Sequence, residues 1–393
     1  MANAEPKLRK VHLSDTTLRD GEQMPGAALD PEAKVEIATL LAQAGVSSVD
    51  AGFPACGSDE IEAIQRIVQA DCGIVVSALC RTLISDIDLA WESLSEAPLQ
   101  KRSVTVFIGT SSLHREYKLR RTVDEIKAMI RHAIEYARRR FDLVCFSPED
   151  ASRTEPDVLC ALYSEAIDAG ASVLGFPDTV GVLTPELVKE QLKRVFDGVP
   201  NVARVALAVH FHNDLGLATA NTLTALRMGV PIAQCTVNGL GERAGNTAME
   251  ELVMAIALHG TAMGLRMDVD PSLLWNLSRR VAQLTGIPVP ANKPIVGDNV
   301  FCTEAGIHQD GLLKHPDTYL PFRPEVVGAS GIRLVLGKHS GRAAFSEKLA
   351  AMGYKLNQRQ LDRIVDFSKA APKEAWRNED TLLASAVAAT TEG

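Results

Sequence analysis

Two histidines two residues apart carry the most specific chemical signal in this sequence. His210 and His212 stand in the run His-Phe-His-Asn-Asp at the end of a short apolar stretch. If that stretch is a β-strand, side chains at positions i and i+2 point to the same face, so both imidazoles can bind one ion. Two hydrogen-bonded histidines would have the same spacing, and taken alone the pair favours that simpler interpretation.

Oxygen donors after two other predicted strands could complete an ion site. Asp20 follows the first predicted strand and Asn246 follows the eighth, and both strands lie close to the seventh if the sheet closes into a barrel. Two imidazoles and two oxygen ligands with open positions suit an octahedral Zn²⁺, Mn²⁺, Mg²⁺ or Co²⁺. The four residues together predict a divalent metal site.

Other polar residues follow the same strand ends, and each has a structural interpretation beside a functional one. Arg19 could stabilise a developing oxyanion or form an ion pair at the rim, and Glu149 could simply cap the following helix. Thr179 could bind a substrate carboxylate beside a metal, or it could only end a strand. The remaining candidates at these positions are Gln23, Arg81, Asp150 and Glu242.

The elements that must position these residues follow from the hydrophobic pattern. Short β-branched runs alternate with amphipathic stretches, and eight strand–helix units in roughly 250 residues indicate a (β/α)₈ TIM barrel of the α/β class. A doubly wound sheet would need G-x-G-x-x-G after its first strand, where this chain has Arg-Asp-Gly-Glu-Gln. The predicted strands are 11–18, 47–53, 73–79, 103–109, 143–147, 172–177, 204–212 and 232–238.

The pattern changes after the barrel, which predicts a division into four parts. Residues 1–265 form the barrel, 266–300 a linker with a helix, 301–345 an accessory subdomain and 346–393 a C-terminal helical subdomain. His308 and Tyr319 are the reactive candidates in the accessory part, although a lone exposed histidine is more often inert. The basic glycine loop 337–342 could bind an anion, but the simpler interpretation is a helix N-cap.

Composition argues against several classes of protein. The net charge of −8 disfavours general nucleic-acid binding, and a polyanion such as CoA would need a local basic patch. No apolar run is long enough for a membrane helix, and the first ten residues lack the apolar segment of a signal peptide. The seven cysteines form no C-x-x-C pair, which is typical of a reduced, cytoplasmic protein.

Long motifs in a fixed order give the chain a resemblance to a known enzyme family. From residue 11 to about 345 it resembles the 2-isopropylmalate synthase and homocitrate synthase family, acetyl-CoA-dependent condensing enzymes of the metal-dependent TIM-barrel superfamily. The motifs are DTTLRDGEQ at 15–23, GFPA at 52–55, FSPEDA at 146–151, PDTVG at 177–181, HFHNDLG at 210–216, NGLGERAGN at 238–246, GIHQDG at 306–311 and LGKHSGR at 336–342.

The resemblance implies an activity and a role for each candidate. It implies an acyltransferase that condenses acetyl-CoA with a 2-oxo acid and then hydrolyses the thioester. It also implies a homodimer in which the accessory segment reaches the active site of the partner subunit. The implied roles are metal binding by Asp20, His210 and His212 with Asn246 nearby or ligating, ketone activation by Arg19, carboxylate binding by Thr179, support by Glu149 and Glu242, and acid/base chemistry by His308 and Tyr319. Gln23 and Arg81 are further substrate-binding candidates, Arg81 for an extra anionic group.

Departures from the family pattern leave the acceptor open. Cys145 stands where lysine-pathway homocitrate synthases resemble one another in carrying an Arg for the distal carboxylate of 2-oxoglutarate, and Asp50 and Met24 are smaller departures. Because the chain ends soon after the accessory helices, no leucine-binding regulatory domain is expected. The alternatives are a homocitrate synthase, a phosphono- or phosphinomethylmalate synthase, and an acyl-CoA lyase or aldolase, which would lack the accessory motifs. A metabolite-sensing protein that has lost catalysis is the non-enzymatic alternative.

Overall fold

The computed structural model describes residues 8–391. The chain forms two compact units, residues 1–289 and 290–393, which are described one at a time. The four-part division predicted from the sequence is finer than this one, and its boundaries at residues 265, 300 and 345 stay predictions.

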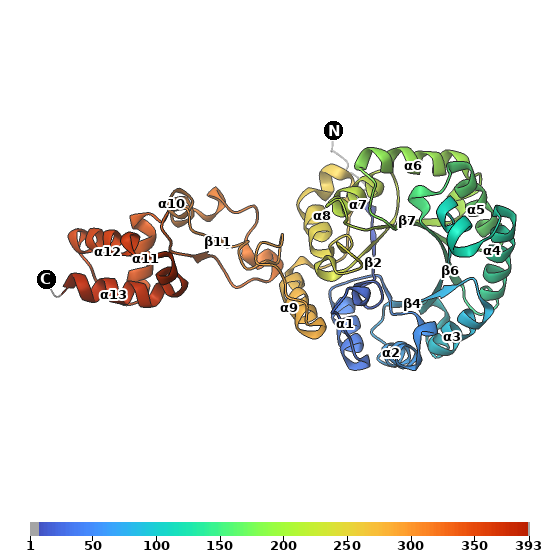
Figure 1. The fold of residues 1–393 in the computed structure, drawn as a ribbon, viewed down its shortest axis with the longest axis horizontal. Helices are drawn as coiled ribbons and strands as arrows, with labels where there is room; N and C mark the ends of the chain where they lie inside the picture. Colours follow the sequence, from blue (N-terminus) through green and yellow to red (C-terminus); the bar gives the residue numbers. More distant parts are fainter. Residues whose placement is uncertain (1–7, 392–393) are drawn as a thin grey trace, which may run out of the picture. The chain divides into compact units, whose positions relative to one another are not determined.

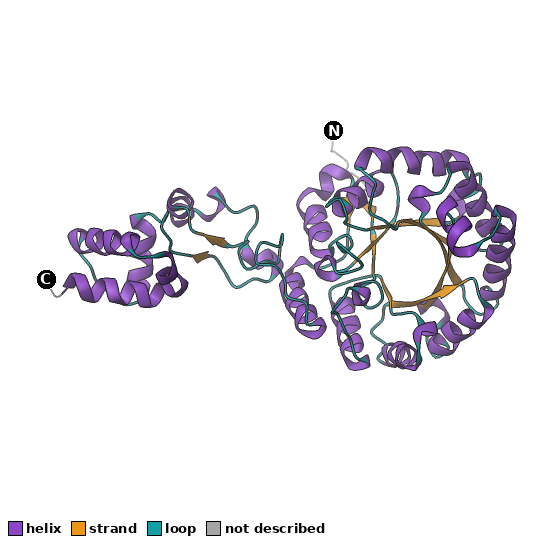
Figure 2. Ribbon diagram, in the orientation of Figure 1, coloured by secondary structure: helices purple, strands orange, loops and turns teal. Residues whose placement is uncertain are grey.

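Eight parallel strands of the first unit close into a barrel, with β2 paired to both β3 and β9. This confirms the predicted TIM barrel, which Figure 2 shows as a ring of strands inside a ring of helices. The strands are β2 (His12–Asp15), β3 (Ser48–Asp50), β4 (Val75–Arg81), β5 (Arg102–Gly109), β6 (Leu143–Glu149), β7 (Val173–Asp178), β8 (Ala206–Phe211) and β9 (Ile232–Cys235).

One helix follows each barrel strand and lies on the outside (Figure 1). Asp30 and Thr184 cap their helices with side-chain oxygens, and Thr122 forms a capping box with Glu125. These caps satisfy backbone N–H groups that a helix start leaves without partners. The helices are α1 (Pro31–Gln43), α2 (Ser58–Gln69), α3 (Ile84–Leu94), α4 (Val123–Ala137), α5 (Pro156–Asp168), α6 (Pro185–Gly198), α7 (Ala218–Arg227) and α8 (Met249–Met263).

Strand alternation separates the outer core from the barrel axis. Along β4, Val76, Ala78 and Cys80 are buried, whereas the residues between them are partly exposed. Ser77, one of these partly exposed residues, borders a cavity of about 220 Å³ inside the barrel. Its lining is rich in hydroxyl and amide groups, from Ser14, Ser48, Ser77, Ser103, Thr105 and Gln234.

Two further pieces complete the first unit. Short strands β1 (Arg9–Lys10) and β10 (Leu265–Arg266) pair in parallel outside the barrel. Helix α9 (Leu274–Thr285) packs beside α1, and Arg280 on α9 forms an ion pair with Glu36 on α1.

The second unit is a small, mostly helical body. Its apolar core gathers around Phe345, which is fully buried, with Leu349 and Ile364 beside it. The predicted helical character of the C-terminal part is thus confirmed. Its elements are β11 (Cys302–Thr303), α10 (Gly306–Lys314), β12 (Arg333–Leu334), α11 (Arg342–Ala351), α12 (Gln358–Ala370) and α13 (Glu379–Thr391).

Neither membrane-crossing helices nor disulfides occur in the described part of the chain. No helix within residues 8–391 has the length and apolarity needed to span a bilayer. All seven cysteines are free thiols.

Candidate metal centre and active site

Three predicted metal ligands converge at the carboxyl end of the barrel. The Nε2 atoms of His210 and His212 lie 3.3 Å apart, and Asp20 Oδ2 lies 3.4 Å from the first and 3.9 Å from the second. All three side chains are buried, and one ligand atom from each lies within 4.8 Å of the others. A divalent ion with ligand distances of about 2 Å can contact three atoms at this spacing.

The charge states of these groups favour cation binding. Burial by itself would raise the pKa of Asp20, but the Arg19 guanidinium and the two histidines hold it well below its usual value. Burial, and then the neighbouring His210, lower the pKa of His212 to about 4. At neutral pH the centre therefore offers a carboxylate and a neutral imidazole, which are the forms that ligate metals.

Asn246 lies directly against this centre. Its Nδ2 donates hydrogen bonds to Asp20 Oδ1 at 2.9 Å and to Leu240 O at 3.0 Å. Its Oδ1 is buried and, like Nδ1 of His212, has no hydrogen-bond partner among the described residues. Buried polar atoms without partners are costly, and an ion or a water molecule would satisfy the Asn246 oxygen.

Gly241 makes the close approach of these groups possible. Its φ is +148°, and a side chain there would overlap the Asn246 amide and lie 2.8 Å from Asp20 Oδ1. Only glycine fits this position without moving the centre.

Arg19 is fixed beside the centre by two carboxylates. Its Nε donates to Asp50 Oδ2 at 2.8 Å and its Nη1 donates to Asp20 Oδ2 at 2.9 Å. The Arg19 side chain is only 14% exposed, so the cation is held in one place at the mouth of the barrel. The fixed guanidinium suits the predicted role at a developing oxyanion.

A second group of polar residues borders the mouth at β6 and β7. Glu149 accepts two hydrogen bonds from Lys118 Nζ, at 2.8 and 2.7 Å. Thr179 Oγ1 accepts from Asp150 N at 2.8 Å, which joins the ends of the two strands. His114 Nδ1 lies 3.5 Å from Glu149 Oε2, and His114 Nε2 lies 3.8 Å from Asp150 Oδ2.

The remaining barrel candidates occupy different settings. Gln23 and Glu242 are exposed, and the Glu242 backbone N–H faces Asp20 Oδ1 at 3.4 Å. Arg81 donates to both oxygens of Asp86, at 2.7 and 3.0 Å. Its role in substrate binding stays a prediction.

His308 and Tyr319 belong to the second unit, where they lie together. Their rings stack with centroids 4.2 Å apart and an angle of 30° between planes. Both side chains are exposed within that unit.

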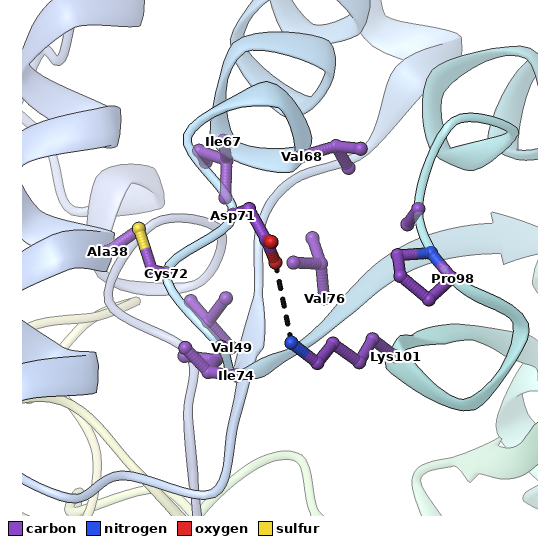
Figure 3. A pocket seen from close by; sticks show the side chains of 12 residues that line it. Ala38, Val49, Ile67, Val68, Asp71, Cys72, Ile74, Val76, Pro98 and Lys101 are labelled. Carbon is purple, nitrogen blue, oxygen red and sulfur yellow. Dashed lines mark hydrogen bonds and ion pairs between the residues drawn. The ribbon is translucent and has the colours of Figure 1, made fainter.

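A small cavity at the other end of the barrel wall has no part in this centre. Figure 3 shows its lining, mostly apolar, with Lys101 pointing to Asp71 at 3.3 Å. Its volume of about 20 Å³ has room for about one water molecule. It lies where β4 and β5 begin, at the end of the barrel opposite to the metal-ligand candidates.

Comparison with known proteins identifies the family. The HMGL-like family model matches residues 10–281, and the homocitrate synthase post-HMGL domain-like model matches residues 295–375. The 2-isopropylmalate synthase of Pyrococcus furiosus is 45% identical over 91% of this chain and 71% of its own length. The chain belongs to the 2-isopropylmalate synthase and homocitrate synthase family. This confirms the resemblance indicated by the order of the sequence motifs.

Other members of the 2-isopropylmalate synthase and homocitrate synthase family match over similar lengths. The 2-isopropylmalate synthase of Aquifex aeolicus is 45% identical over 92% of this chain and 69% of its own, and that of Bacillus velezensis is 42% identical over 96% and 72%. Among solved structures, hydroxymethylglutaryl-CoA lyase from Pseudomonas aeruginosa has a TM-score of 0.60 at 22% identity. It covers 73% of this chain and 96% of that one. The lyase from Brucella melitensis has a TM-score of 0.59 at 19% identity, covering 71% and 99%. At identities this low, the similarity between the lyases and this chain shows a shared fold.

A buried lysine that was not predicted from the sequence supports two loops that carry family motifs. Lys34 on α1 is 1% exposed and contacts Glu60 and, at 2.6 Å, Glu22 of the DTTLRDGEQ motif. Glu60 also accepts from Phe53 N at 2.9 Å, so Lys34 links the loops after β2 and β3. Buried lysines are rare without partners, but a lysine in an amphipathic helix gives no sequence signal of burial.

Asp15, which opens the same motif, anchors the loop that carries Arg19 and Asp20. Its carboxylate accepts from Thr17 N at 2.8 Å and from Thr17 Oγ1 at 2.9 Å. Thr17 Oγ1 in turn accepts from Val237 N at 2.9 Å, across the closing strands of the barrel. Complete burial raises the pKa of Asp15 to about 7.

Replacing Asp15 with asparagine is expected to remove part of the pH dependence of stability. With a pKa of about 7 against an ordinary 3.8, folded Asp15 keeps a proton that the unfolded chain releases. The contribution of Asp15 is therefore full below about pH 4 and is lost as pH rises to about 7, a change of about 4 kcal/mol. Urea unfolding at several pH values should show the wild type losing stability relative to the Asp15→Asn variant across this interval. Parallel pH profiles of the two proteins would contradict the expectation.

Proposed function

We propose that this protein is an acyltransferase that condenses acetyl-CoA with a 2-oxo acid and hydrolyses the thioester, releasing CoA. The observation that carries the proposal is the buried Asp20, His210 and His212 cluster beside Arg19, in a chain 45% identical to a 2-isopropylmalate synthase. A cation site next to a fixed guanidinium suits a reaction in which a carbonyl oxygen gains negative charge.

The proposed cofactor is one divalent metal ion, Zn²⁺, Mn²⁺, Mg²⁺ or Co²⁺. Asp20, His210 and His212 would hold it, and Asn246 Oδ1 would ligate it or lie beside it. The donor set fits such an ion because it offers one anionic oxygen and two imidazole nitrogens, and because buried atoms at its edge lack protein partners. When bound, the ion would supply Lewis-acid polarisation of the acceptor's keto and carboxylate oxygens.

The chain's own residues would bind and orient the acceptor. Thr179 lies at the end of β7, where its hydroxyl could donate to the acceptor carboxylate. Arg19 uses two of the five N–H groups of its guanidinium for Asp20 and Asp50, so it can still donate to an alkoxide oxygen at C2. Glu149 and Glu242 would support the site, and Gln23 is a further candidate for substrate contact.

The bond-forming step needs a base for the acetyl methyl group. We assign His308 and Tyr319 to this acid/base role, acting at the active site of the partner subunit in a homodimer. Removal of a methyl proton gives an enolate, whose carbon attacks C2 of the acceptor while the keto oxygen becomes an alkoxide and takes up a proton. Water then cleaves the thioester to a carboxylate and the CoA thiol. A positioned acid or base typically contributes about 10²–10⁴-fold to such a step.

The lack of a cation at Cys145 and the engaged cation of Arg81 favour an acceptor without a distal anionic group. Cys145 borders the axial cavity, and burial raises the pKa of its thiol to about 12, so it offers no charge. Arg81 is engaged with Asp86, which leaves its cation less suited to a distal carboxylate or phosphonate. We therefore propose 2-oxoisovalerate as the acceptor and 2-isopropylmalate as the product. Homocitrate-type and phosphonomethylmalate-type products are the alternatives.

Acceptor-dependent release of CoA tests this proposal. The assay follows thiol release from acetyl-CoA with 2-oxoisovalerate, 2-oxoglutarate, oxaloacetate, pyruvate and phosphonopyruvate, before and after the metal is stripped. We expect release with 2-oxoisovalerate to exceed the others by at least about tenfold, in keeping with the 1–3 kcal/mol that a fitted methyl or methylene is worth. We also expect it to vanish on stripping and to return with added metal. Release with none of the acids from metal-loaded protein would instead favour a lyase.

The setting proposed for the enzyme is cytoplasmic, without membrane or nucleic-acid partners. Seven free thiols and the net charge of −8 support this.

A further inference from the structure

Gly311 on helix α10 has no side chain, and the ring of Tyr319 occupies the space that a side chain there would need. A methyl group on Gly311 would lie 2.5 Å from Cε2 and 2.8 Å from Cδ2 of Tyr319. Non-bonded carbons prefer separations of about 3.5–4.0 Å. The Tyr319 ring therefore rests directly on the helix backbone at this position.

The same ring stacks on His308, one turn earlier on α10. Residues at i and i+3 share a helix face, so Gly311 and His308 together form the surface that Tyr319 covers. Gly311 has no positive φ, and its backbone is helical. Since alanine is the best helix former and glycine one of the poorest, the helix itself gains nothing from glycine here.

The backbone of α10 cannot easily shift to accept a larger residue. The buried Gln309 side chain donates to Thr303 O at 3.0 Å and to Val335 O at 2.9 Å, which ties the helix to the residues at β11 and β12. At the helix start, Gly306 N donates to His339 O at 3.1 Å, and a methyl on Gly306 would lie 2.7 Å from Gly341 N. The glycine loop before α11 thus holds the start of α10 by backbone contact.

Tyr319 is also held on its own side. The turn Pro316–Thr318 brings the chain back over the helix, and Thr318 Oγ1 donates to His315 O at 2.7 Å. A methyl group at position 311 would also lie 3.0 Å from this hydroxyl oxygen.

We propose that Gly311 is a positioning residue for the His308–Tyr319 pair: its missing side chain lets the Tyr319 ring stack on His308 and set the direction of the imidazole. This inference rests on the proposed function for the part that the pair plays in the reaction. The stack itself is a property of the second unit. Gly311 acts through Tyr319 and does not contact substrate.

The test is the Gly311→Ala variant of the 393-residue chain, with Lys314→Ala as the control on the same helix. We expect Gly311→Ala to lower kcat by about 10–100-fold, because displacements near 1 Å can cost about 10²-fold. KM should change less than about threefold, and the thermal midpoint should stay near the wild-type value, because the ring that must move is exposed on the second unit. Lys314, which is exposed, should tolerate alanine without change in kcat.

A double-mutant cycle and an NMR signal separate positioning from a general structural effect. Gly311→Ala should add little to the kcat loss of Tyr319→Ala, since both remove one contact. The His308 ring protons, assigned with His308→Gln, should be shifted upfield by the Tyr319 ring and lose this shift in Gly311→Ala and Tyr319→Ala alike.

The outcomes distinguish a failure of the positioning role from a failure of the proposed function. A full additional loss of kcat in the double variant, or a His308 signal that Gly311→Ala leaves unmoved, would overturn the positioning role. A His308 signal that moves as expected while kcat stays at the wild-type value would support the positioning of the ring. That result would overturn the acid/base role given to the pair.

Discussion

Replacing His210 with alanine is expected to empty the proposed metal centre and lower kcat by about 10³-fold or more. A Lewis acid contributes several kcal/mol to stabilisation of developing charge, and each 1.36 kcal/mol is a factor of ten in rate. The variant also leaves Asp20 and His212 without the third member of a cluster whose atoms lie 3.3–3.9 Å apart. Metal content by plasma mass spectrometry and CoA release measured on one preparation test both parts.

A second histidine variant provides the control. His132→Ala changes an exposed side chain on α4 and should leave metal content and kcat near wild-type values. Normal metal content in His210→Ala, with the fold intact by circular dichroism, would contradict the assignment of this centre. Lost metal with unchanged turnover would separate the metal from the chemistry and contradict the proposed role.

Mixing two inactive variants is expected to restore activity if the active site is shared between subunits. In a dimer of Asp20→Asn and His308→Ala, one site would combine Asp20 and His308 from different chains and be intact. Random mixing makes about half of the dimers mixed, each with one intact site of two, so about 25% of wild-type activity should return. The measurement is CoA release after the variants are dissociated together and reassembled.

The mixed-dimer experiment needs two controls. Each variant carried alone through the same procedure should stay inactive. Asp20→Asn mixed with His210→Ala should also stay inactive, because each barrel in the mixed dimer then lacks one metal ligand. No recovery from Asp20→Asn with His308→Ala, once mass spectrometry shows that mixed dimers have formed, would mean that His308 does not act in the partner's site.

The barrel and its metal-ligand candidates could be predicted because they depend on local patterns. The eight strands follow from β-branched runs with helical stretches between them, and the shared face of His210 and His212 follows from strand geometry alone. Closure of β2 against β9 then brings Asp20 to the same rim, as parallel barrels require.

The parts that sequence could not predict depend on individual side-chain contacts and not on local hydrophobic patterns. The interaction of Arg81 with Asp86 and the double contact of Lys118 with Glu149 are choices among several charged neighbours. Burial of Lys34 is set by Glu22 and Glu60 on either side of it, not by its own helix. The need for glycine at position 311 depends on the Tyr319 ring, whose position over the helix the sequence does not reveal.

Product analysis with labelled acetyl-CoA tests directly whether the enzyme joins the acetyl group to a 2-oxo acid. Metal-loaded enzyme is incubated with [1,2-¹³C]acetyl-CoA and 2-oxoisovalerate, and the products are read by mass spectrometry and ¹³C NMR. The proposed condensation predicts 2-isopropylmalate two mass units heavier than the unlabelled compound, with its labelled methylene bonded to the former keto carbon and with one CoA released for each molecule formed. Labelled acetate as the product, without a new carbon–carbon bond to any 2-oxo acid tested, would contradict it.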